Sequence, residues 1–139
     1  MPQNDTISGD KPLRVFVVED DLWYGELLVH HLSLNPDNQV QRFESAADLM
    51  EALNERPDVI TLDYTLTDMR GDVLYKKIRA VLPDAMVIMI SGQEDITTAL
   101  NLLREGVYDY LVKNEETKDR LWNAVNNIRK NLALRDEVQ

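Results

Sequence analysis

The sequence contains no cysteine, no long apolar run and no signal-peptide pattern at its start. The absence of cysteine excludes disulfide bonds and thiolate chemistry. No stretch approaches the roughly 18 consecutive apolar residues of a membrane-spanning helix. The N-terminal MPQNDTISGD also lacks the basic and apolar regions of a signal peptide, in that order. We therefore expect neither membrane insertion nor export, and a cytoplasmic location is the default.

Basic residues are scarce relative to acidic ones. Fifteen Lys and Arg stand against twenty-five Asp and Glu, which gives a net charge of -10. This balance argues against direct binding to the phosphate backbone of a nucleic acid. The 139 residues, 44% hydrophobic and 29% charged, match the size and composition of one folded globular domain.

Short apolar runs alternate along the chain with patterns of helical period. The runs predict five strands, at residues 13–18, 40–43, 59–62, 85–90 and 108–112. The helical patterns begin near residues 22, 46, 71, 94 and 116. We predict a loose N-terminal tail over residues 1–10 and a folded domain over 11–130. Residues 131–139 are predicted to extend the last helix, as a linker to a further domain if this is one part of a longer protein.

This alternation predicts the α/β class, a doubly wound parallel sheet joined by right-handed βαβ crossovers. In such folds ligands bind outside the carboxyl ends of the strands. Polar residues stand at four of these ends: Glu19-Asp20-Asp21 after the first strand, Asp63 after the third, Ser91 after the fourth and Lys113 after the fifth.

Several carboxylates converging at one sheet edge either acquire raised pKa values or recruit a cation. Mg²⁺ suits such an edge, because it takes one or two protein carboxylates and keeps waters or phosphate oxygens. With an ion present, Asp63 is an ionised nucleophile at the end of a buried strand. Lys113 and Ser91 would then face the oxygens of a phosphoryl group, which is the arrangement that phosphoryl transfer requires.

Each of these residues has a plainer interpretation when taken alone. The acidic run is typical of a helix N-terminus, and we assign Asp21 to capping rather than to binding. Asp63 could cap a turn, and Lys113 could be a surface charge. The functional interpretation depends on their joint occurrence at the strand ends.

Four ordered stretches resemble the receiver domains of bacterial two-component response regulators. They are VFVVEDD, VITLDYTLTDMRG, VIMISG and REGVYDYLVK, within a resemblance that covers about residues 13–129. Asp63 precedes Ser91 by 28 positions and Lys113 by 50, close to the family spacing. The resemblance implies a flavodoxin-like (βα)5 fold with strand order 2-1-3-4-5. Around GVYDYLVK and the last helix the chain is similar to receivers of enhancer-binding, NtrC-like transcription activators.

The resemblance implies that Asp63 is the phosphoacceptor and that the cofactor is Mg²⁺. The implied metal ligands are three carboxylates and one backbone carbonyl, those of Glu19, Asp20, Asp63 and Thr65. Ser91 and Lys113 are implied to bind the phosphoryl group. The side chains of Thr65 and Gln93 are implied to face the hydrolytic water; neither is a strong base, so we expect slow loss of the phosphoryl group.

The implied partner is a sensor histidine kinase or a phosphotransfer protein. Ser91 and Tyr110 are the implied switch residues, which alter the surface of the helix over 94–104, the strand over 108–112 and the last helix. The resemblance favours a homodimer through these two helices or through the extension of the last one. It implies no enzyme in the usual sense, since the domain catalyses only its own phosphorylation and slow dephosphorylation. A stand-alone receiver and a part of a longer regulator both remain open.

Two residues depart from the family pattern. Thr67 stands where the family usually has the proline of Leu-Pro-Asp, so the loop lacks one residue with a fixed φ. Asn114 follows Lys113 where the family usually has proline, often with a cis bond. A cis bond to a residue other than proline costs about 2.5 to 4 kcal/mol, so we predict a trans Lys113–Asn114 bond.

Other function classes fit less well. A haloacid-dehalogenase-type hydrolase also forms an aspartyl phosphate, but its motif usually needs an acid where Thr65 stands. A flavodoxin-like binding module would need a glycine- and hydroxyl-rich phosphate loop after the first strand. A degenerate receiver that acts as an interaction module without phosphorylation would be expected to lack Asp63 or Lys113.

Overall fold

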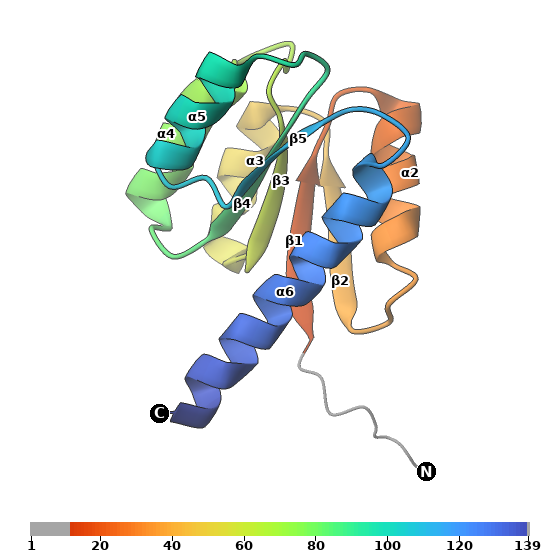
Figure 1. The fold of residues 1–139 in the computed structure, drawn as a ribbon, viewed down its shortest axis with the longest axis vertical. Coiled ribbons are helices and arrows are strands. Elements are labelled where there is room, and N and C mark those ends of the chain that lie inside the picture. Colours follow the sequence, from red (N-terminus) through yellow and green to blue (C-terminus); the bar gives the residue numbers. More distant parts are fainter. Residues whose placement is uncertain (1–11, 139) are drawn as a thin grey trace.

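A computed structural model describes residues 12–138 as a five-stranded parallel sheet with helices on both faces (Figure 1). The strands lie in the order β2-β1-β3-β4-β5. Their bounds are β1 (Leu13–Val18), β2 (Asn38–Phe43), β3 (Val59–Asp63), β4 (Met86–Ser91) and β5 (Asp109–Val112). The helices are α2 (Leu22–Leu32), α3 (Ala46–Ala52), the 3-10 helix η1 (Leu53–Glu55), α4 (Gly71–Val81), α5 (Ile96–Arg104) and α6 (Thr117–Val138). The predicted fold class and strand order are confirmed.

Alternate residues of the buried strands supply two separate cores. On β1, Phe16 and Val18 pack into the core beneath α3, α4 and α5, whereas Val15 and Val17 pack beneath α2 and α6. Both sets are almost fully buried because a parallel sheet with helices on each face has no solvent-facing side. This double burial explains why the strands are continuous apolar runs rather than alternating ones.

The boundaries differ from the sequence prediction by one or two residues where hydrogen bonds decide them. Strand β2 begins at Asn38, because it pairs with β1 from Leu13 onward and the Asn38 side chain donates to the carbonyl of Leu32. Helix α5 begins at Ile96 because Asp95 is its N-cap, accepting a hydrogen bond from the amide of Thr98.

Helix α6 continues without interruption to Val138, past the end of the sheet (Figure 1). The predicted extension of the last helix over 131–138 is therefore helical, and Gln139 lies outside the described residues. The predicted tail over residues 1–10 also lies outside them. Among residues 12–138, no helix is long and apolar enough to cross a membrane.

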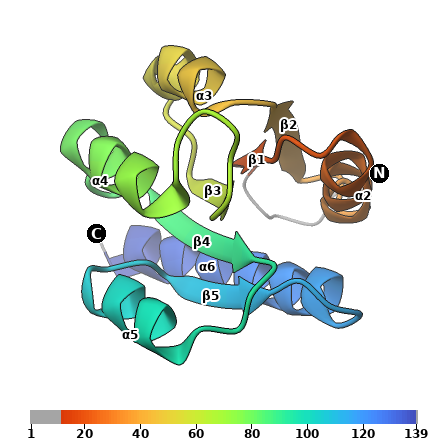
Figure 2. The same ribbon diagram turned by 90° about the horizontal axis from the view of Figure 1, so that it is seen from above.

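All five strands point the same way, so the loops that follow them gather at one edge of the sheet (Figure 2). The loop after β3 is restrained at both ends. Its ends are joined by a bridge between Thr65 and Arg70, and the amide of Gly71 donates to the carbonyl of Tyr64. A Cβ atom at Gly71 would lie 2.7 Å from the Tyr64 Cα atom and 3.0 Å from the Asp63 carbonyl oxygen. Only glycine lets α4 start this close to the end of β3.

We expect Gly71→Ala to lower the free energy of unfolding by about 1 to 3 kcal/mol, because backbone atoms must move to admit the methyl group. Gly92→Ala is the matched control, since a Cβ atom there meets nothing within 4 Å. Its effect should stay within about 0.5 kcal/mol. Urea unfolding of the two variants checks this, and equal stabilities would contradict the packing explanation.

Candidate functional site

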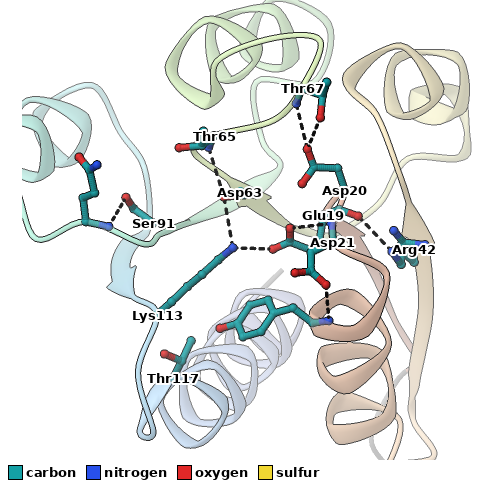
Figure 3. A network of polar contacts seen from close by, with 12 residues as sticks. Glu19, Asp20, Asp21, Arg42, Asp63, Thr65, Thr67, Ser91, Lys113 and Thr117 are labelled. Atoms are coloured by element: carbon teal, nitrogen blue, oxygen red, sulfur yellow. Dashed lines mark hydrogen bonds and ion pairs between the residues drawn. The ribbon is translucent and has the colours of Figure 1, made fainter.

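Three carboxylates converge at the carboxyl edge of the sheet (Figure 3). Glu19 follows β1 and Asp63 ends β3, and their exposed fractions are only 2% and 5%. One oxygen from each of Glu19, Asp20 and Asp63 lies within 4.8 Å of the others. The adjacency of β1 and β3 in the sheet produces this cluster from residues more than forty positions apart.

Lys113 brings a positive charge to the two buried carboxylates. Its Nζ lies 3.0 Å from Glu19 Oε1 and 3.6 Å from Asp63 Oδ1. Its backbone amide donates to the carbonyl of Ser91, which ties the loop after β5 to the end of β4. Lys113 thus lies at the edge of the sheet where its position after the fifth strand predicted it.

Tyr24 also contacts Lys113, although its sequence position predicted no role for it. The Nζ of Lys113 lies 4.6 Å from the centroid of the Tyr24 ring, within reach of a cation-π interaction. Burial raises the pKa of the Tyr24 hydroxyl above its usual value. The only signal in the sequence was its place in the first turn after the acidic run, which does not separate a packing role from a functional one.

The pKa values of the charged groups in and beside the cluster shift in different directions. Burial is the main cause that raises the pKa of Glu19 from 4.5 to about 7; the neighbouring Asp63 adds to the rise, and the hydrogen bond from Lys113 opposes it. Burial by itself would lower the pKa of Lys113, but Glu19 and Asp63 outweigh it and raise that pKa. Burial likewise opposes ionisation of Asp20, yet hydrogen bonds from Thr67 hold its pKa below the usual value.

Asp21 does not join this cluster. Its side chain accepts a hydrogen bond from the amide of Tyr24 at 3.1 Å and caps the N-terminus of α2. The predicted capping role is confirmed. The three acids of the run therefore have different roles: Glu19 and Asp20 belong to the cluster, and Asp21 caps α2.

The remaining predicted site residues lie in the loop after β3, at the end of β4, in the loop after β4 and on β5. The Thr65 amide donates to Asp63 Oδ1 at 3.2 Å, while its side chain is exposed. Ser91 is buried at the end of β4, and its hydroxyl oxygen accepts from the amide of Gln93 at 3.1 Å. The Tyr110 hydroxyl donates to the Gln93 carbonyl at 3.2 Å. Ser91, Gln93 and Tyr110 thus form one connected set beside the cluster.

The cluster fits a hard divalent cation such as Mg²⁺. Its donors are carboxylate oxygens, the ligand type that Mg²⁺ prefers, and they lie close enough to share an ion. Burial and the repulsion from Asp63 together raise the pKa of Glu19 despite the hydrogen bond from Lys113. An added positive charge would relieve this repulsion.

The bond between Lys113 and Asn114 is trans, as predicted, since residues 12–138 contain no cis peptide bond. Asn114 instead starts the turn into α6. Its amide donates to Thr117 Oγ1, and its side-chain oxygen accepts from the amide of Glu116. The Thr117 hydroxyl in turn donates to the Val112 carbonyl at 2.7 Å. These bonds hold the residue after Lys113 without a proline.

The Glu19 pKa leads to a prediction about stability. Between pH 4.5 and about 7 the folded protein holds a proton on Glu19 that the unfolded chain has lost, so raising the pH through this window lowers the free energy of unfolding. We expect Glu19→Gln to remove this loss and to be more stable than the wild type at pH 8, by up to about 3 kcal/mol. At pH 4 the gain should vanish.

Urea unfolding of both proteins at several pH values, with a chelator present, measures the difference. A stability difference that does not grow with pH would contradict the assignment of the raised pKa to Glu19. Glu26→Gln, on the exposed side of α2, is the matched control and should show no such trend.

Comparison with known proteins agrees with this geometry. The family model of the response regulator receiver domain matches residues 15–126. The chain is 35% identical over 104 residues to the DNA-binding transcriptional regulator NtrC of Proteus hauseri, which covers 72% of this chain and 21% of NtrC. It is 40% identical over 93 residues to the luminescence regulatory protein LuxO of Vibrio campbellii, covering 66% of this chain and 20% of LuxO. The chain spans about a fifth of the length of these relatives.

A solved structure gives the same result. The signal receiver domain of a LuxO protein from Vibrio parahaemolyticus superposes with a TM-score of 0.83 at 28% identity, covering 93% of this chain and 98% of that domain. The similarity to NtrC-like receivers expected from the sequence is therefore confirmed. The chain belongs to the response regulator receiver domains of two-component systems.

Proposed function

We propose that this receiver accepts a phosphoryl group on Asp63 from the phosphohistidine of a sensor histidine kinase or a phosphotransfer protein. The observation that carries the proposal is a buried carboxylate at a strand end, set between two further acids and the ammonium group of Lys113. An oxygen of Asp63 attacks the phosphorus atom, the bond from phosphorus to the histidine nitrogen breaks, and the histidine keeps the electron pair.

The residues around Asp63 have separate roles in this transfer. Glu19, Asp20, Asp63 and the Thr65 carbonyl would hold a Mg²⁺ ion, which would supply positive charge for the phosphoryl group. Lys113 places its ammonium group on the phosphoryl oxygens, and the Ser91 hydroxyl donates a hydrogen bond to one of them. The protein orients these groups, and no further enzymatic activity is proposed for it.

The connected set Ser91, Gln93 and Tyr110 is proposed as the switch. Movement of the Ser91 hydroxyl toward the phosphoryl group would break its bond with the Gln93 amide, and Tyr110 would turn into the vacated space. The affected surface consists of α5, β5 and α6. Exposed apolar side chains on α5, with Ile96 at 74% exposed, provide a contact area for a homodimer or an output domain. An output in transcription regulation is proposed from the likeness to NtrC.

The kinase is proposed to dock on the outer face of α2. Trp23 is 82% exposed and Leu27 is 48% exposed, one turn apart on this face. The helix begins directly after Asp20 and Asp21, so a partner bound there lies next to the acidic cluster. An apolar stripe beside a reactive carboxylate suits a partner that must present a phosphohistidine.

The test is intact-mass spectrometry after incubation with acetyl phosphate and Mg²⁺. We expect one phosphoryl adduct per chain, lost in Asp63→Asn and in a chelated sample. Asp84→Asn, remote from the cluster, is the control that should keep the adduct. A folded protein without any adduct would contradict the proposal and favour an interaction module that works without phosphorylation.

We also expect slow self-hydrolysis of the phosphoryl group, because neither Thr65 nor Gln93 is a strong base. Mass spectrometry after removal of acetyl phosphate follows the decay in Mg²⁺ alone. Thr65→Ala and Gln93→Ala should change the decay rate without changing the initial yield. Rapid decay of the wild type would overturn this expectation.

A further inference from the structure

Thr67 makes two hydrogen bonds to the same atom of the acidic cluster. Its backbone amide donates to Asp20 Oδ2 at 3.0 Å, and its hydroxyl donates to that oxygen at 2.5 Å (Figure 3). The two residues are 47 positions apart and belong to the loops after β1 and β3. A proline at this position could make neither bond, since it has no N–H and no hydroxyl.

Thr67 is itself held in place by its neighbours. Leu66 is buried in the core, and the carboxylate of Asp68 accepts hydrogen bonds from the amides of Ala46 and Ala47 at the start of α3. The loop is also closed by the bridge between Thr65 and Arg70. Thr67 therefore presents its two donors to Asp20 from a fixed position, although the loop lacks the family's proline.

Asp20 needs such support more than the other two acids. Glu19 and Asp63 are buried, whereas Asp20 is partly exposed, so the surrounding packing restrains its carboxylate less. Rotation toward solvent would hydrate this carboxylate, which a charged group favours. Two donors on Oδ2 oppose it and keep the carboxylate within 4.8 Å of the other ligand atoms.

We propose that Thr67 is a positioning residue that holds the Asp20 carboxylate ready to bind a divalent cation. The inference rests on the proposed metal site. Groups that orient a ligand through hydrogen bonds typically change metal affinity by about 10- to 100-fold when they are removed. Where the family usually has proline, Thr67 thus makes a direct contact with Asp20, a proposed metal ligand. This contact joins the loop after β3 to the metal site.

The test is a titration of ¹⁵N-labelled protein with Mg²⁺, followed by the amide chemical shifts of Asp21 and Tyr64. Thr67→Ser keeps both donors, Thr67→Val removes the hydroxyl, and Thr67→Pro removes both. We expect the Kd to be unchanged in the serine variant, to rise severalfold in the valine variant, and to rise about 10-fold or more in the proline variant.

The outcomes separate the inference from the proposed function. If the wild type shows no saturable shift, no metal site exists and both fail. If the wild type binds and Asp20→Asn loses binding, while the valine and proline variants bind as tightly as the wild type, only the role of Thr67 is overturned. Thermal unfolding of each variant verifies folding, and the valine variant decides the question if the proline variant does not fold.

Discussion

The structure of the site depends on the repulsion among three carboxylates that the parallel sheet brings to one edge. Two of them are almost fully buried, and Lys113 is the cation that contacts both. Burial is the main cause of the raised pKa of Glu19, and the neighbouring Asp63 adds to it despite the hydrogen bond from Lys113. The proposed affinity for a divalent ion follows from this grouping of acids, and the ion together with Lys113 would offset the negative charge of a phosphoryl group.

The loops that follow the strands keep this repulsive arrangement in place. Gly71 lets α4 begin directly against the end of β3, and Thr67 joins the loop after β3 to Asp20. The loop after β5 is held by Thr117 and Asn114. Each loop is restrained by side-chain to backbone hydrogen bonds, so the charged groups are ordered before any ligand arrives.

The sequence supported a large part of this description. Fully apolar runs indicated strands buried on both faces, and the rule that ligands bind at the carboxyl ends of parallel strands selected Asp63, Ser91 and Lys113. Asp21 was correctly separated from its neighbours, because a capping residue is recognised from local pattern alone. Element ends shifted by one or two residues, because caps such as Asp95 and cross-strand pairing decide them.

The order of apolar and polar residues along the chain determined the fold class, the edge that carries the charged groups and their identity, because these follow from periodicity and from the direction of parallel strands. Only the tertiary structure decided which groups touch. The contacts of Thr67 with Asp20 and of Tyr24 with Lys113 join residues far apart in the chain. Their distances depend on how the loops pack across the sheet edge, which no local pattern encodes.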